Sequence, residues 1–400
     1  MALDVERVKD AYPALKDGYA YLDGAAGTQV PTAVIEAVSG AYASGLGNLG
    51  GAFPASRRSE EIVTACRQAV ADLVGGEPEG VVLGPNMTTL TYRMAMTLAG
   101  EWEPGDNVVV SRLDHDANVR PWVQAATRAD VEVRWAEIDA DSSLGAEQYD
   151  DLVSERTRLV AVTAASNIIG SRPDVPGIAE RAHAVGALTY VDGVHWTPHG
   201  RVDVEAMGAD LYTTSAYKWS GPHIGAVIAA PSLLTALHPL KLAPSTDAVP
   251  WRFEWGTPSF ADFAGVTAAV DHLASLDDGA TGSRRERLVT SMAAVERYEH
   301  ELFARMLEGL DSMAHVTTYG RAPRRAPTAF FNIEGMPPGE VAARLAEARV
   351  NVWSGDNYAF ELVGALGLRS RGGAVRAGVV HYNDVSDVDR LLEAVESLKR

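Results

Sequence analysis

Seven short apolar runs rich in β-branched residues alternate with helical patterns between residues 81 and 230. Helical patterns such as 88–99 and 174–185 lie between the runs, and this alternation is typical of repeated βαβ units. It predicts an α/β fold whose large domain holds a seven-stranded, mostly parallel sheet between helices. The runs span 81–83, 107–110, 131–135, 159–163, 188–192, 211–215 and 226–230.

A proline-rich stretch, 239–258, interrupts this alternation and predicts a domain boundary. A long helical region over 260–310 and a β-α-β-α-β-α pattern follow it. We therefore expect a large domain over 16–250 and a smaller α+β domain over 251–400. An N-terminal helix within 1–15 should pack on the smaller domain.

The composition narrows the class of protein. With 400 residues, of which 46% are hydrophobic, the chain can form two domains with sizeable cores. The formal charge of -18 would repel nucleic acid. No stretch approaches the roughly 18 apolar residues of a membrane span, and the N-terminus lacks the apolar core of a signal peptide. We expect a cytoplasmic protein without nucleic-acid or membrane partners. The single cysteine, Cys66, excludes an intrachain disulfide, and no metal-ligand set is visible.

The segment TTSAYKWSGPHIG, 213–225, carries the strongest chemical signal. It places Lys218 just after a predicted strand, at the sheet edge where ligands bind in open α/β folds. A lysine amine there can form a Schiff base with an aldehyde cofactor, although a surface lysine in a turn is the alternative for this segment alone.

Two further candidates lie at the end of the strand LTYVD, 188–192, and just after it. Asp192 ends this strand, where a carboxylate can pair with a protonated pyridine nitrogen or simply cap a helix. His195 could hydrogen-bond a ring hydroxyl of the cofactor or fill a loop.

Four other side chains could complete a site. Thr88 and Thr89 begin a predicted helix, whose free N–H groups and dipole favour an anion such as phosphate. His115 follows a strand and could stack on a flat ring or transfer protons. Arg376 lies in a predicted strand, where its guanidinium needs a partner such as a substrate carboxylate. A helix cap, a loop histidine and a structural ion pair are the respective alternatives.

The segment GLGNLG, 45–50, matches a dinucleotide-binding fingerprint. It follows a helical pattern instead of a strand, and no helix begins at its end, so we interpret it as a loop. A nicotinamide-dependent dehydrogenase is therefore not expected.

Seven segments together resemble the fold-type I enzymes of aminotransferase class V that use pyridoxal 5'-phosphate (PLP). Within that class they are similar to the cysteine desulfurase-like and selenocysteine lyase-like group. They occur in the family's order and span nearly the whole chain. The segments are YLDGAAGTQVP, DHDAN, ASNIIG, VDGVH, SAYKWSGPHIG, EWGTPS and VRAGVVHYN.

The resemblance implies roles for individual residues. Lys218 would carry PLP as an imine, Asp192 would pair with its pyridine nitrogen, and His115 would stack on its ring. Asn167 would lie near the ring hydroxyl and the carboxylate of an amino-acid substrate, which Arg376 would bind.

The resemblance also implies a homodimer with shared active sites, in which four hydroxyl side chains hold the phosphate: Thr88, Thr89, Ser215 and, from the neighbouring subunit, Thr257. Two cofactor-binding positions depart from the family pattern. His195 stands where desulfurases commonly have glutamine, and Tyr217 stands where many relatives have histidine.

The sulfur-accepting cysteine of desulfurases is missing. That cysteine lies on a loop shortly before the arginine strand, yet residues 311–400 contain none. Cys66 lies on an apolar helical stripe with Ile62, Val63 and Val70, which is typical of core packing. A persulfide mechanism is therefore disfavoured.

We predict a PLP-dependent enzyme that cleaves the carbon–sulfur bond of a cysteine-derived or S-substituted amino acid. The reaction would be β-elimination through an external aldimine and a quinonoid. The alternatives are desulfurase-like activity, an aminotransferase, an epimerase, a decarboxylating deaminase and a non-catalytic protein of the same fold. Specificity should lie in the loops around Ala25, Trp122, Trp251 and 353–358.

Overall fold

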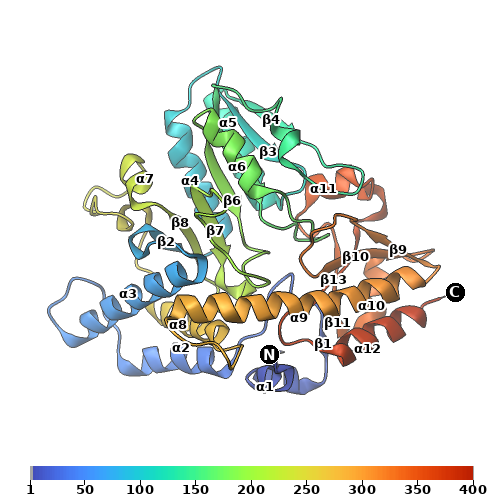
Figure 1. Ribbon diagram of the computed structural model, residues 1–400. Coiled ribbons are helices and arrows are strands. Elements are labelled where there is room, and N and C mark those ends of the chain that lie inside the picture. Colours follow the sequence, from blue (N-terminus) through green and yellow to red (C-terminus); the bar gives the residue numbers. More distant parts are fainter. Residues whose placement is uncertain (1–2, 400) are drawn as a thin grey trace.

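A computed structural model describes residues 3–399, and its centre is a seven-stranded sheet (Figure 1). Strand β8 runs antiparallel to its neighbours β2 and β7, whereas the other pairs are parallel. The predicted mostly parallel sheet is confirmed. In spatial order the strands are β2 (Val81–Gly84), β8 (Gly225–Ala229), β7 (Leu211–Ser215), β6 (Leu188–Asp192), β5 (Thr157–Thr163), β3 (Asn107–Ser111) and β4 (Glu132–Ala136).

Helices cover both faces of this sheet, which explains the continuous apolar runs. In β3, Val108 and Val110 pack into one core cluster, with residues of α4 (Met87–Leu98) and α5 (Arg120–Ala129). Val109 packs into the opposite cluster, with residues of α6 (Val175–Ala184) and α3 (Pro54–Val74). The short helix α7 (Pro231–Ala236) follows β8.

The helical region predicted over 260–310 is two helices, α8 (Phe260–Ala274) and α9 (Arg284–Ser312). They are separate because Gly282 has a φ of +93° and Ser283 begins α9 with a capping box to Glu286. Helix α8 packs against α3 and α2 (Thr32–Ser44). Helix α9 runs beneath the large sheet towards the C-terminal region (Figure 1).

The C-terminal region holds an antiparallel four-stranded sheet. Helices α10 (Pro338–Glu347) and α12 (Val385–Glu396) pack with it into a third core cluster, and α11 (Phe360–Ala365) lies between its strands in sequence. The strands, in spatial order, are β12 (Trp353–Gly355), β13 (Ala374–Gly378), β10 (Thr328–Ile333) and β9 (Val316–Tyr319).

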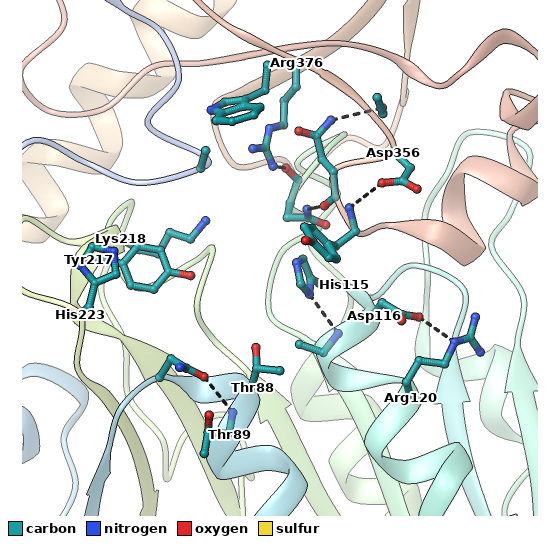
Figure 2. Close-up of a pocket in the computed structure, with 18 of the residues that line it drawn as sticks. Thr88, Thr89, His115, Asp116, Arg120, Tyr217, Lys218, His223, Asp356 and Arg376 are labelled. Carbon is teal, nitrogen blue, oxygen red and sulfur yellow. Dashed lines mark hydrogen bonds and ion pairs between the residues drawn. The ribbon is translucent and has the colours of Figure 1, made fainter.

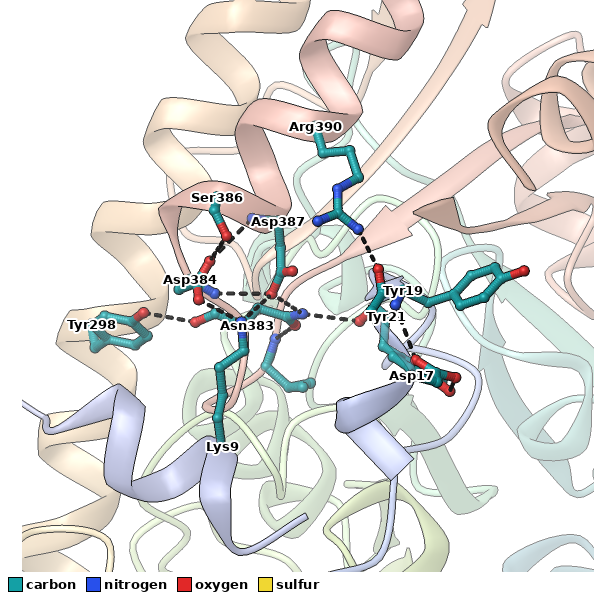
Figure 3. Close-up of polar contacts among 12 residues, drawn as sticks. Lys9, Asp17, Tyr19, Tyr21, Tyr298, Asn383, Asp384, Ser386, Asp387 and Arg390 are labelled. Atoms are coloured by element: carbon teal, nitrogen blue, oxygen red, sulfur yellow. Dashed lines mark hydrogen bonds and ion pairs between the residues drawn. The ribbon is translucent and has the colours of Figure 1, made fainter. Parts of the chain in front are cut away.

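The N-terminal segment contacts the C-terminal region. Strand β1 (Ala20–Tyr21) pairs with β11 (Val350–Asn351). Lys9, on α1 (Val5–Asp10), forms ion pairs with Asp384 and, at 3.1 Å, with Asp387 at the start of α12 (Figure 3). The division into domains at residue 250 stays a prediction. Within residues 3–399, no helix is long and apolar enough to cross a membrane.

Candidate active site

A cleft of about 970 Å³ lies between the large sheet and the four-stranded sheet (Figure 2). Loops and helix starts that follow strands of the large sheet line part of it, and residues of β12 and β13 line another part. Lys218, Tyr217 and His223 form one side, and His115, Asp116 and Arg120 lie opposite. The strands of the large sheet bring their carboxyl ends to this edge, because every strand except β8 runs in the same direction.

A smaller inner cavity of about 40 Å³ adjoins the cleft and shares five lining residues with it: Thr88, His115, Asn167, Tyr217 and Lys218. Asp192 and His195 line only this inner cavity. The structure thus brings together seven of the residues that the sequence selected. Arg376 joins them from β13 as a lining residue of the cleft.

Lys218 lies just after β7, and its Nζ donates a hydrogen bond to the carbonyl oxygen of Ala25 at 2.5 Å. Burial, together with the positive charge of Arg376, lowers the pKa of Lys218 from 10.5 to about 7, although Asp192 opposes the shift. A large fraction of this amine is therefore neutral, and nucleophilic, at neutral pH.

Asp192 ends β6, and its Oδ1 accepts a hydrogen bond from the backbone N–H of Val194 at 2.9 Å. Burial raises the pKa of this carboxyl to about 6, while the Val194 N–H and Lys218 act in the opposite direction. A cation placed beside Asp192 would stabilise its ionised form.

His115 is held as a neutral imidazole. Its Nδ1 accepts a hydrogen bond from the backbone N–H of Ala117 at 3.0 Å, so the proton resides on Nε2. Burial, assisted by Lys218 and Arg376, lowers the pKa of His115 to about 3. The ring stacks on Tyr358, with centroids 5.5 Å apart.

Arg376 is buried in β13, and burial lowers the pKa of its guanidinium to about 10. Its NH1 donates to the carbonyl oxygen of Asn167 at 3.0 Å, and within residues 3–399 it forms no ion pair. The side chain of Asn167 donates to the carbonyl oxygen of Asn357 at 2.8 Å, whereas its Oδ1 is buried without a hydrogen-bond partner. The guanidinium of Arg376 can therefore bind an anion, and the Oδ1 of Asn167 can accept a hydrogen bond from a ligand.

The start of α4, where we expect the anion site, faces the cleft. Asn86 caps the helix, with its Oδ1 accepting from the backbone N–H of Thr89 at 2.8 Å. Asn86, Thr88 and Thr89 all line the cleft. Sequence analysis missed Asn86, although its place before the helix was a signal for a capping residue.

Two of the predicted phosphate ligands do not line this cleft. Ser215 is buried, and its hydroxyl accepts a hydrogen bond from the backbone N–H of Met87 at 3.0 Å, so it supports the start of α4. Thr257 is exposed on the segment that follows β8 and α7. Its contact with a neighbouring subunit stays a prediction.

The chain matches the family model described as aminotransferase class-V over residues 20–391. The protein is a member of the aminotransferase class-V family. Similar proteins and solved structures match this chain over its whole length.

The Mycobacterium tuberculosis protein named "Uncharacterized protein MT3887" is 37% identical to this class-V enzyme over 400 residues, which are 100% of both chains. A probable cysteine desulfurase of Pseudomonas putida is 32% identical and covers 94% of this chain and 92% of its own. The apo structure of a cysteine desulfurase from Thermococcus onnurineus is 27% identical, with a TM-score of 0.89, and covers 100% of this chain and 98% of its own. The class-V enzyme is thus desulfurase-like, PLP-dependent and of fold-type I, as predicted.

The groups around the inner cavity fit PLP. The Lys218 amine forms no direct ion pair in the described chain and can bind the aldehyde. The Oδ1 of Asn167 is a buried acceptor without a donor, to which a group of the cofactor could donate a hydrogen bond. The Asp192 carboxyl is also buried, and a protonated ring nitrogen could form an ion pair with it. The start of α4 would hold the phosphate.

The two positions that depart from the family pattern have partners of their own. His195 is buried, with Nε2 3.0 Å from the hydroxyl of Thr328, and it packs edge-to-face on His199. Tyr217 stacks on His223, with centroids 4.9 Å apart. His223 also lines the cleft, and sequence analysis missed it although it lies within the segment that contains Lys218.

Specificity was expected in loops around Ala25, Trp122, Trp251 and 353–358. Ala26 and Arg120, which neighbour the first two, line the cleft, whereas the Trp122 and Trp251 side chains do not. Trp122 is wholly buried on α5 and packs on Tyr190 of the sheet, because its helix turns that face inward. Trp251 stacks under Arg67 and does not line the cleft. Segment 353–358 does line it, as predicted. The glycine-rich segment 45–50 is a loop between α2 and α3, also as predicted.

Proposed function

We propose that this enzyme cleaves the carbon–sulfur bond of S-substituted cysteines by β-elimination. The observation that carries the proposal is the absence of a thiol from the cleft. Cys66, the one cysteine of the chain, is wholly buried in α3, and burial raises the pKa of its thiol. Segment 353–358, which precedes the arginine strand and walls the cleft, has none.

The carboxylate of the substrate would bind to Arg376. This guanidinium is buried and forms no ion pair within residues 3–399, although the charge of Asp23 favours its protonated form. A substrate carboxylate could therefore accept charge-assisted hydrogen bonds from it. Lys218 lines the same cleft and would therefore face Cα of a substrate held in this way.

Lys218 would bind the aldehyde of PLP before the reaction and, once the substrate amine has replaced it, take the proton from Cα. Burial suits both tasks, because it keeps a large fraction of the amine neutral near pH 7. PLP supplies an electron sink for the negative charge at Cα, and Asp192 would hold the ring nitrogen protonated.

The remaining step needs no protein nucleophile. The Cβ–S bond breaks, its electron pair leaves with sulfur, and the sulfur takes up a proton to give a free thiol. The three-carbon fragment leaves as aminoacrylate, which water hydrolyses to pyruvate and ammonia. A desulfurase mechanism would instead need a thiolate beside the substrate sulfur.

The test is to mix the PLP-loaded enzyme with S-methylcysteine, S-benzylcysteine and cysteine. Pyruvate and free thiol should form in equal amounts, with no persulfide on the protein by mass spectrometry. The Cys66→Ala variant should retain this activity. Sulfide release from cysteine that depends on Cys66 would refute the proposal. Conversion of PLP to its pyridoxamine form without thiol release would indicate an aminotransferase.

A further inference from the structure

Three large aromatic side chains line the cleft and are exposed to solvent. They are Tyr92 on α4, Trp353 on β12 and Tyr358 in the loop after β12, with 37%, 53% and 73% of their surface accessible. Exposed aromatic rings gathered at one cleft are typical of a surface that contacts a ligand. The cleft, of about 970 Å³, lies at the upper end of common ligand sites and has to hold both PLP and the substrate.

The loop that presents Tyr358 has a strained backbone. Asn357 and Tyr358 are consecutive non-glycine residues with φ values of +50° and +59°. This left-handed conformation costs on the order of 1 kcal/mol per residue and is often retained at functional sites.

Three hydrogen bonds hold this strained loop in place. The backbone N–H of Asp116 donates to the carbonyl oxygen of Tyr358 at 2.7 Å. The side chain of Asn167 donates to the carbonyl oxygen of Asn357, and the backbone N–H of Tyr358 donates to Asp356 at 3.0 Å. Tyr358 therefore stays stacked on His115 although most of its side chain is exposed.

The charged side chains beside Tyr358 disfavour an acidic ligand. Arg120 is already paired with Asp116, at 3.0 Å, and with Glu361. The carboxylate of Asp356 forms no ion pair within the described chain. A second carboxylate on the substrate would thus lie near the Asp116 and Asp356 carboxylates, and no unpaired cation of this part of the described chain would offset the repulsion.

We propose that Tyr358 and Trp353 form a specificity subsite for a bulky, apolar and non-anionic substituent on the substrate sulfur. This inference rests on the proposed carbon–sulfur lyase function. The amino-acid end of the substrate binds at Lys218 and Arg376, and the sulfur substituent extends along the cleft to the rings of Trp353 and Tyr358. Burial of such a substituent against the two rings selects it over a methyl group.

The experiment compares kcat/KM for S-benzylcysteine, S-methylcysteine and S-carboxymethylcysteine with the PLP-loaded enzyme. The benzyl substrate should exceed the methyl substrate about tenfold or more, the range that an apolar pocket provides. The carboxymethyl substrate should be the poorest. Tyr358→Ala should lower the benzyl-to-methyl ratio about tenfold, whereas Tyr358→Phe should keep it. Tyr42→Ala removes a ring of similar exposure, 64%, on α2 outside the cleft, and should also leave the ratio unchanged.

The outcomes separate this inference from the function on which it rests. If thiol is released from all three substrates at similar kcat/KM, the lyase function stands and the subsite is refuted. The subsite is also refuted if Tyr358→Ala lowers both rates by the same factor, because the ring would then act through His115. If no substrate releases thiol, the lyase function fails. Dissociation constants, from the shift of the PLP absorption, then decide the subsite: tighter binding of S-benzylcysteine that is lost in Tyr358→Ala supports it, and equal binding overturns it.

Discussion

The amine of Lys218 differs from an ordinary lysine because it is buried beside Arg376. A lysine amine attacks an aldehyde only when it is deprotonated, so the rate of PLP attachment rises with pH through the pKa of Lys218. With a pKa of about 7, the rate should level off above neutral pH and not near 10.5. The measurement is the absorbance change after mixing PLP with the cofactor-free protein at pH 6 to 10.

Two variants check the assignment of this pH profile. Lys218→Ala should show no PLP adduct in the protein mass after borohydride reduction. Arg376→Gln removes a positive charge that lowers the pKa of Lys218, so its profile should move to higher pH. A wild-type profile that is still rising at pH 10 would contradict the prediction.

Arg376 should contribute to substrate affinity through the carboxylate. Replacing it with alanine should raise KM about 10- to 100-fold, as expected for the loss of a charge-assisted hydrogen bond worth about 1.5–3 kcal/mol, with a smaller change in kcat. S-benzylcysteamine, which lacks the carboxylate, is the control ligand. Equal weakening of both ligands in Arg376→Ala would indicate a structural role instead.

At the level of single elements, the start of α4 combines a helix cap with the expected phosphate site. Asn86→Ala should lower the free energy of unfolding by about 1 kcal/mol through loss of the cap, and should also weaken PLP binding. Ser283→Ala is the matched control, because it removes the cap of α9, which is not part of the cleft. Urea denaturation and PLP titration measure the two effects. Identical PLP affinities in both variants would exclude a phosphate at α4.

On the scale of the whole molecule, a buried polar cluster ties the segment after Lys218 to both ends of the chain. The hydroxyl of Tyr12 lies 2.7 Å from Ser220, 2.9 Å from His272 on α8 and 2.7 Å from His381 after β13. Tyr12 is wholly buried, and burial raises the pKa of its hydroxyl, so it stays protonated and can donate to one of these groups.

Tyr12→Phe should therefore destabilise the protein by about 1–3 kcal/mol, because it leaves buried polar groups without a partner. Thermal unfolding measures this loss, and hydrogen exchange over residues 216–224 should become faster. Tyr42→Phe, on an exposed position of α2, should change neither. Unaltered exchange in Tyr12→Phe would show that the cluster does not support the loop after Lys218.

The local pattern of apolar residues in the sequence was sufficient to predict the large sheet and one side of the site. Most strands of the large sheet are buried on both faces and therefore appear as apolar runs in the sequence, whereas the edge strand β4 is partly exposed. All seven strands, β2 to β8, were predicted within two residues of their observed bounds. Parallel strands bring their carboxyl ends to one edge, which places Asp192, Lys218 and His115 close together once the strands are known. The missing thiol was also visible in the sequence, because it is a matter of composition.

The other side of the site depended on packing between distant segments. The stacking of Tyr358 on His115 and the places of Trp353 and Arg376 in the cleft arise because the four-stranded sheet faces the edge of the large one. Trp122 was misassigned for the same reason, since its type predicts a contact surface but only its orientation shows that it is core. Hydrophobic periodicity records which face of an element is buried. It does not record which element covers that face, so this half of the cleft became visible only in three dimensions.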